Sequence, residues 1–161
     1  MKYADELDRC QNFGDVFDLV KKAVKEILGQ GRAGLMLILA ELPMNVGAFH
    51  GLGSNAIVMN RLLLDSIVRS GKSKREINSF VYLILLHEYL HSLGHVDEES
   101  VRRLVCEIAR KALGEAHPAT EMAATGYTSI LPHKPPAGKP QVRDEIEIIG
   151  DFDRSNQEYI R

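Results

Sequence analysis

The chain contains few of the residues that form covalent cross-links. It has only two cysteines, Cys10 and Cys106. Two cysteines without a C-x-x-C spacing do not make a disulfide framework or a redox motif. Such cysteine usage is typical of reduced thiols, so we expect a cytoplasmic location.

Long apolar runs and an excess of basic charge are also missing. The longest apolar run, LMLILAEL from Leu35, is far shorter than the roughly 20 residues needed to cross a bilayer. The N-terminal residues, MKYADELDRC, are acidic and lack the apolar region of a secretory signal. With a formal net charge of −2, the chain has no clustered excess of Lys and Arg to bind phosphate groups. We therefore expect neither a membrane nor a nucleic acid as a partner.

The sequence predicts one folded domain over residues 1–131, followed by a proline-rich linker and C-terminal tail over residues 132–161. The chain has 161 residues, of which 45% are hydrophobic, enough for one core. Apolar periodicity and helix-end signals predict the following elements: a helix over 15–28, a buried strand over 34–43, a second strand over 56–60, a short helix or strand continuation over 61–68, a long helix over 73–93, a helix over 98–113 and a strand over 145–149.

The long helix has the clearest signals. Ser73 and Glu76 form an S-x-x-E capping box at its start, and Gly94 follows its end. Its apolar residues continue nearly all the way round the helix up to Leu93, which predicts a buried helix rather than a surface helix. Asp97 then occupies a suitable position to cap the next helix.

The end of this helix carries the pattern HEYLH, which has the chemistry of a metal site. His87 and His91 are four residues apart, so their rings lie about 40° apart on one face of the helix. Two ring nitrogens in this arrangement can bind one metal ion. Glu88 is rotated by about 100° from His87 and is better placed to accept a proton from a water molecule than to bind the same ion. Three clustered ionisable groups on an apolar helix predict a metal site rather than a histidine-bearing core helix.

HEYLH resembles the zinc-binding signature of the zincin metallopeptidases, and the order of the elements from about residue 15 to 114 is similar to that of the smallest zincin domains. The resemblance implies an α+β fold, with a small mixed sheet packed on a backing helix and on the HExxH helix. It also implies bound Zn²⁺, with Glu88 as the general base. In zincins, an edge strand above the cleft pairs with an extended substrate. Residues 55–60 would be that strand here, unless they form an ordinary core strand.

The third metal ligand has several candidates. In the metzincin-like pattern, a glycine turns the chain back and the ligand lies six residues after the second histidine, which corresponds to Gly94 and Asp97. In the gluzincin-like pattern the ligand is a glutamate of the following helix, for which the candidates are Glu98, Glu99 and Glu107. We place Asp97 first, then Glu98, then His95, which would lie about 6 Å beyond His91 if the helix continued. Asp97 has the competing interpretation of a helix cap.

The predicted function is that of a zinc-dependent metallopeptidase acting on peptide or protein substrates. One alternative is a metal-dependent hydrolase of RNA, because a small bacterial RNA-processing family has a similar helix. That family typically carries Gly at the position of Glu88. A second alternative is a non-catalytic binding module that zinc stabilises.

The remaining signals concern the tail and the other histidines. The tail either is a disordered end or docks on an edge strand of its own or of a neighbouring chain, where it could inhibit the site. His117 and His133 are expected in solvated loops. His50 is expected at the surface, with the border of the cleft as the alternative.

Overall fold

The computed structural model describes residues 3–51, 53–126 and 146–154. Its elements follow in the order α1 (Ala4–Asp8), α2 (Phe13–Leu28), β1 (Met36–Ala40), β2 (Ala48–His50), β3 (Ala56–Asn60), α3 (Arg61–Arg69), α4 (Lys74–Ser92), α5 (Glu98–Leu113), α6 (Pro118–Thr125) and β4 (Glu147–Ile149). Within the described residues, six helices and a small mixed sheet confirm the α+β class.

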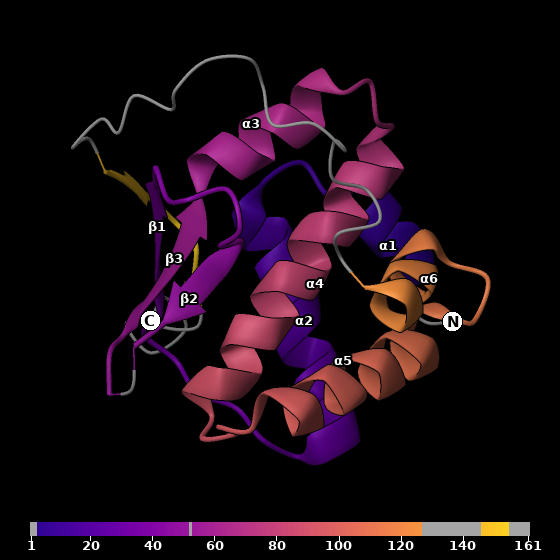
Figure 1. Ribbon diagram of the computed structural model, residues 1–161. Coiled ribbons are helices and arrows are strands. Elements are labelled where there is room, and N and C mark those ends of the chain that lie inside the picture. The colour runs from indigo at the N-terminus through magenta and orange to yellow at the C-terminus, as the bar shows by residue number, and fades with distance from the viewer. Residues whose placement is uncertain (1–2, 52, 127–145, 155–161) are drawn as a thin grey trace.

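The four strands form one sheet in the order β2-β3-β1-β4. β1 and β3 run parallel at its centre, while β2 and β4 are antiparallel to their neighbours. The helices all lie on one side of this sheet (Figure 1). Leu37, Leu39, Ile57 and Met59 alternate along the central strands and are at most 6% exposed, because they face the helical layer.

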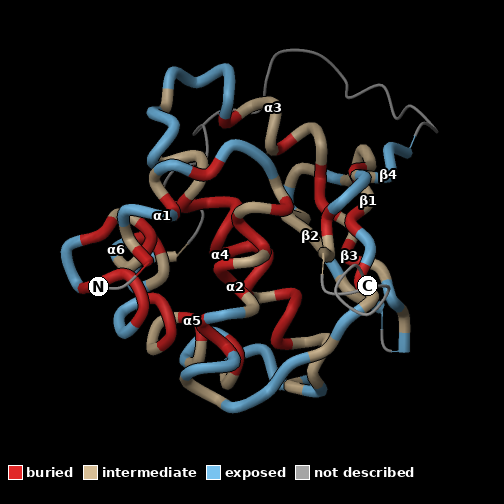
Figure 2. The backbone as a smooth tube through the Cα atoms, turned by 180° about the vertical axis from the view of Figure 1, so that it is seen from behind, coloured by how far each residue is buried: buried red, intermediate tan, exposed pale blue. Residues whose placement is uncertain are grey.

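Helix α4 is the centre of the molecule. The predicted capping box is present, since the Ser73 side chain accepts a hydrogen bond from the Glu76 backbone and the Glu76 side chain accepts one from the Ser73 backbone. Residues 79–86 are buried on every face of the helix, as expected from their uninterrupted apolar pattern. Figure 2 shows this buried core where α4 and α2 lie together. Gly94 has a φ of 103°, which ends the helix in a conformation that favours glycine.

Two predictions about the strands need correction. Residues 55–60 do not form an edge strand, because β3 pairs with β1 on one side and with β2 on the other. The edge strand on this side of the sheet is β2, which lies outside the strands predicted from the sequence. Gly47 precedes it, and a Cβ atom there would lie 3.2 Å from the Cδ1 atom of Ile84. The chain can therefore run close to α4 at this point.

Part of the expected C-terminal tail belongs to the folded domain. β4 pairs with β1, on the edge of the sheet opposite to β2. Phe152 is 2% exposed and stacks on Phe17 of α2 at 4.2 Å between ring centroids. The described tail residues thus add an edge strand, β4, to the sheet of their own chain. The proline-rich part of the predicted linker, residues 132–140, and the last residues, 155–161, lie outside the described residues.

His117 is buried, so the expectation of a solvated loop was wrong. Its Nδ1 atom accepts a hydrogen bond from the Ala119 backbone at the start of α6, at 3.1 Å. Its Nε2 atom donates to Asp8 of α1 at 2.9 Å. The imidazole connects the two helices. His133 lies outside the described residues.

No helix among the described residues is long and apolar enough to span a bilayer.

Candidate metal centre

The last turns of α4 bring the two histidines of HEYLH together. The Nε2 atoms of His87 and His91 lie 3.2 Å apart, and their ring centroids lie 4.9 Å apart. This closeness follows from their spacing of four residues on a regular helix. Burial lowers the pKa of His87, although the carboxylate of Glu98 opposes part of this effect. A lowered pKa favours the neutral imidazole, which is the form that binds metals.

Glu98, in the first turn of α5, supplies the carboxylate of the cluster. Its Oε2 atom lies 3.0 Å from Nε2 of His87, and its Oε1 atom lies 2.8 Å from Nε2 of His91. His87, His91 and Glu98 are a group that can hold a metal ion, since one potential ligand atom of each lies within 4.8 Å of the others. Glu98, the gluzincin-like candidate nearest to the turn at Gly94, is therefore the carboxylate that reaches the two histidines.

Asp97, our first candidate for the third ligand, lies outside this cluster. Its Oδ2 atom accepts hydrogen bonds from the backbone N–H of Ser100 at 2.9 Å and from its hydroxyl group at 2.6 Å. Asp97 is exposed and acts as the N-cap of α5. The competing interpretation, a helix cap, is the arrangement found. The direction of α5 after the Gly94 turn decides which carboxylate points toward α4, and that direction depends on tertiary packing.

The side chain of His95 also lies outside the cluster, but the backbone of His95 contacts the His91 ring. The carbonyl group of His95 accepts a hydrogen bond from Nδ1 of His91 at 2.7 Å. The His95 ring bonds instead to the side chain of Gln30, with 2.7 Å between Nε2 and Oε1. The carbonyl contact orients the His91 ring, and second-sphere contacts of this kind are typical of metal-binding histidines.

This contact also fixes the tautomer of His91. A carbonyl group can only accept, so Nδ1 of His91 carries a proton and Nε2 has a free lone pair when the ring is neutral. That lone pair faces Nε2 of His87 at 3.2 Å and Oε1 of Glu98 at 2.8 Å. A proton on Nε2 of His87 can bridge to Nε2 of His91 or to the Glu98 carboxylate in the metal-free chain, and a metal ion could take the place of that proton. The chemistry of the three side chains therefore fits a cation.

The spacing fits a tetrahedral ion as well. Ligand atoms about 2.0–2.1 Å from a tetrahedral zinc ion lie about 3.3–3.4 Å from one another. Here the Nε2 atoms of His87 and His91 lie 3.2 Å apart, and they face different oxygens of Glu98, at 3.0 Å and 2.8 Å. One ligand atom of each residue lies within 4.8 Å of the others, so rotation of the Glu98 carboxyl group would adjust one oxygen to the ion. Three protein ligands leave one position open, as in catalytic rather than structural zinc sites.

Glu88 lies beside this cluster with its carboxyl group largely removed from water. It is 7% exposed, and burial raises its pKa from 4.5 to about 7. The positive charge of a protonated His91 would oppose this rise. A carboxyl group with a pKa near neutrality can accept and return a proton at physiological pH.

Glu88 opens into a shallow cleft of about 220 Å³ between α4, β2 and the start of α5, lined by Ala48, Phe49, His50, Glu88, His91, Val96 and Glu98. β2 forms one wall of the cleft and is an edge strand. His50, expected at the surface, instead borders the cleft, where its Nε2 atom donates to the carbonyl group of Ser54 at 2.8 Å. Among the described strands none pairs with the outer edge of β2, so an extended chain in this cleft could pair with that edge beside Glu88.

Asn60 is a supporting residue that the sequence did not indicate. It is 1% exposed and caps α3. Its Nδ2 atom donates to three carbonyl groups of the loop before β2, those of Leu42, Pro43 and Val46. This amide holds the loop that delivers β2 to the cleft. An Asn immediately before a helix was the available signal, but it indicates only the cap.

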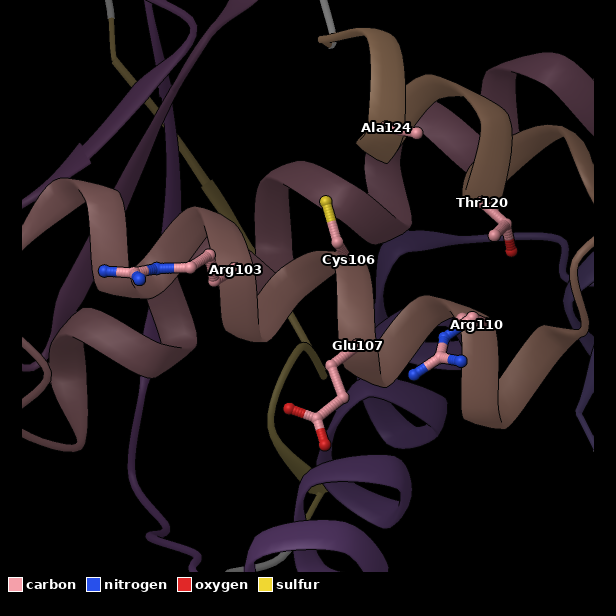
Figure 3. Close-up of a pocket in the computed structure, with 6 residues that line it drawn as sticks. All are labelled: Arg103, Cys106, Glu107, Arg110, Thr120 and Ala124. Carbon is pink, nitrogen blue, oxygen red and sulfur yellow. The ribbon is translucent and has the colours of Figure 1, made fainter.

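A second depression, of about 330 Å³, lies between α5 and α6. Figure 3 shows that its side chains project in different directions, with Arg103 extending away from Cys106. The Cys106 thiol donates to the carbonyl group of Ala123 at 3.1 Å, and burial raises its pKa. A protonated thiol is a poor nucleophile. The depression therefore lacks a convergent set of reactive groups.

No protein-family model matches the chain, and no curated protein or solved structure matches it either.

Proposed function

We propose that the protein is a zinc-dependent peptidase that hydrolyses extended peptides. The observation that carries the proposal is the combination of a His-His-Glu cluster with a separate buried carboxyl group in the same cleft. His87, His91 and Glu98 would hold the ion. Glu88, with a pKa of about 7, would be the proton carrier.

Each group has a distinct role in this proposal. When bound, zinc acidifies a water molecule and polarises the scissile carbonyl group. Glu88 accepts the proton of the attacking water and transfers it to the departing amine, so that its charge returns to the starting state. The free edge of β2 holds the substrate backbone through main-chain hydrogen bonds, which give affinity with little side-chain selectivity.

The two alternatives explain the cleft less well. RNA hydrolysis would bring phosphate groups into a cleft that contains the carboxylates of Glu88 and Glu98. The like charges repel, and the cleft lining contains no Lys or Arg to compensate them. A purely structural zinc site would account for the ligand cluster but gives no role to a carboxyl group whose burial is costly.

The test uses the full-length chain loaded with one equivalent of zinc and a mixture of unstructured peptides. We expect cleavage by the wild type, and loss of cleavage in Glu88→Gln with zinc retained. Glu99→Gln is the matched control, because Glu99 is an exposed neighbour of Glu98 on α5 that does not line the cleft. If the wild type and both variants bind equal amounts of zinc but the wild type cleaves no peptide, the structural alternative is supported. Cleavage that persists in Glu88→Gln would remove Glu88 from the mechanism.

A further inference from the structure

Three aromatic rings connect the C-terminal segment to the helix that carries the candidate metal site. Phe152 stacks on Phe17, with ring planes 15° apart and centroids at 4.2 Å. Phe17 in turn meets Tyr89 edge to face, at 5.3 Å between centroids. All three residues are at most 2% exposed. The three rings therefore form a continuous contact, buried from solvent, between the C-terminal segment and α4.

Tyr89 is the residue through which this contact reaches the site. It follows Glu88 directly and is rotated by about 200° from both His87 and His91, so it anchors the opposite face of the helix. Its hydroxyl oxygen accepts a hydrogen bond from the backbone N–H of Arg32 at 3.1 Å. The ring of Phe17 and this hydrogen bond both help to hold the last two turns of α4.

The C-terminal segment is fixed in its place by several polar contacts. Asp153 accepts hydrogen bonds from Lys21 at 2.7 Å and from the backbone N–H of Leu35 at 3.1 Å. The guanidinium group of Arg154 donates to Asp15 at 3.1 Å and to Asp18 at 3.0 Å. These bonds tie the segment to α2 and to the start of β1. The two residues that follow Phe152 therefore hold it against Phe17, and β4, which pairs with β1, precedes it.

We infer that Phe152 is a positioning residue for the metal centre. The inference rests on the proposed metal binding and extends it to a residue far from the cluster in sequence. Removing the Phe152 ring leaves Phe17 without its stacking partner, and Tyr89 then repacks toward the space. Because His87 and His91 lie on α4 while Glu98 lies on α5, movement of α4 changes the spacing of the three ligands.

The experiment compares two mild core substitutions in the full-length chain. Phe152→Leu removes the ring but keeps an apolar side chain. Ile67→Val is the control, since Ile67 is also fully buried and lies in α3, which Figure 1 shows at the opposite end of α4 from the ligands. Zinc affinity is measured by competition with a chromophoric chelator, and the imidazole nitrogen signals of His87 and His91 are recorded by NMR on the metal-free chain.

We expect zinc affinity to fall by about tenfold or more in Phe152→Leu, the range found for residues that orient metal ligands, and to stay unchanged in Ile67→Val. Both substitutions should lower the melting temperature. Equal zinc affinities in the two variants would overturn the inference. If the wild type binds no zinc, the proposed function fails, but the NMR signals of the metal-free chain still test the positioning role of Phe152. Signals that move only in Phe152→Leu support the positioning role, and signals that move in neither or equally in both contradict it.

Discussion

The assignment of the third ligand gives a sharp prediction, because two adjacent carboxylates have different roles. Asp97 caps α5 through Ser100, whereas Glu98 meets both histidines. Zinc that binds the folded chain alone stabilises it by about 2.7 kcal/mol at a free concentration 100 times its Kd. For a domain of this size, about 1 kcal/mol corresponds to about 2–4 °C. The wild type should therefore melt about 5–11 °C higher with zinc.

The two alanine variants should have different effects on the melting temperature. Glu98→Ala removes a ligand, so the zinc-induced rise in melting temperature should nearly vanish while the metal-free value changes little, since Glu98 is exposed. Asp97→Ala removes the cap, which costs about 1 kcal/mol and lowers the melting temperature with and without zinc by about 2–4 °C. The rise caused by zinc should remain.

Thermal unfolding followed by circular dichroism, with and without zinc, measures all four quantities. Loss of the zinc-induced rise in Asp97→Ala, with the rise retained in Glu98→Ala, would contradict Glu98 as the third ligand. That result would restore the metzincin-like ligand and would require α5 to start differently in the zinc-bound chain. A rise that survives in both variants would mean that neither carboxylate is a ligand.

Three further predictions concern residues around the site. Metal-free Glu88 keeps its proton up to about pH 7 when folded but only to about 4.5 when unfolded, so the free energy of unfolding should fall by about 3 kcal/mol as the pH rises through that window. Urea titrations of the wild type and Glu88→Gln should show this difference, and parallel pH profiles would contradict it. Asn60→Ala removes the amide donor to the carbonyl groups of Leu42 and Val46, whereas the Pro43 carbonyl keeps the Val46 backbone N–H as a donor. The change should cost about 1–3 kcal/mol, with weaker hydrogen-exchange protection in β2. Unchanged protection would mean that the loop holds without the amide. Gly14→Ala would improve helix propensity, but the added Cβ would lie 2.7 Å from the carbonyl oxygen of Asp151, so chemical denaturation should show a less stable protein, and a stabilised one would mean that the C-terminal segment is not docked on α2.

The sequence was sufficient to predict the features that depend on local patterns. The capping box at Ser73 and the apolar run after it identify α4, and the spacing of His87 and His91 follows from helix geometry alone. The central strands β1 and β3 were also predicted, from uninterrupted apolar segments that are typical of parallel strands. The expected burial of β1 was only partly correct, since its residues alternate between buried and less buried positions and Met36 is 42% exposed.

The features that the sequence did not predict depend on contacts between distant segments. β2 has only three residues, and its strand geometry comes from pairing with β3 rather than from its own composition. The choice of Glu98 over Asp97 depends on the angle between α4 and α5, which no short pattern encodes. The docking of Phe152 depends on a partner 135 positions earlier, Phe17, to which it is linked through a proline-rich segment that indicated an unfolded tail.

The energetic cost of Glu88 helps to discriminate between a catalytic and a structural zinc site. At neutral pH and above, ionising this buried carboxyl group would destabilise the metal-free protein by about 3 kcal/mol, as its raised pKa implies. A glutamine of the same shape would avoid this cost, so stability alone gives no reason for a glutamate here. A dication held by His87, His91 and Glu98 lowers the cost, because its positive charge favours the carboxylate form of Glu88. Zinc binding near pH 6.5 should therefore release a proton from Glu88, detectable as a difference in proton release between the wild type and Glu88→Gln by calorimetry in two buffers of different ionisation enthalpy. Equal proton release from both would show that the ion and the carboxyl group are too far apart to act together.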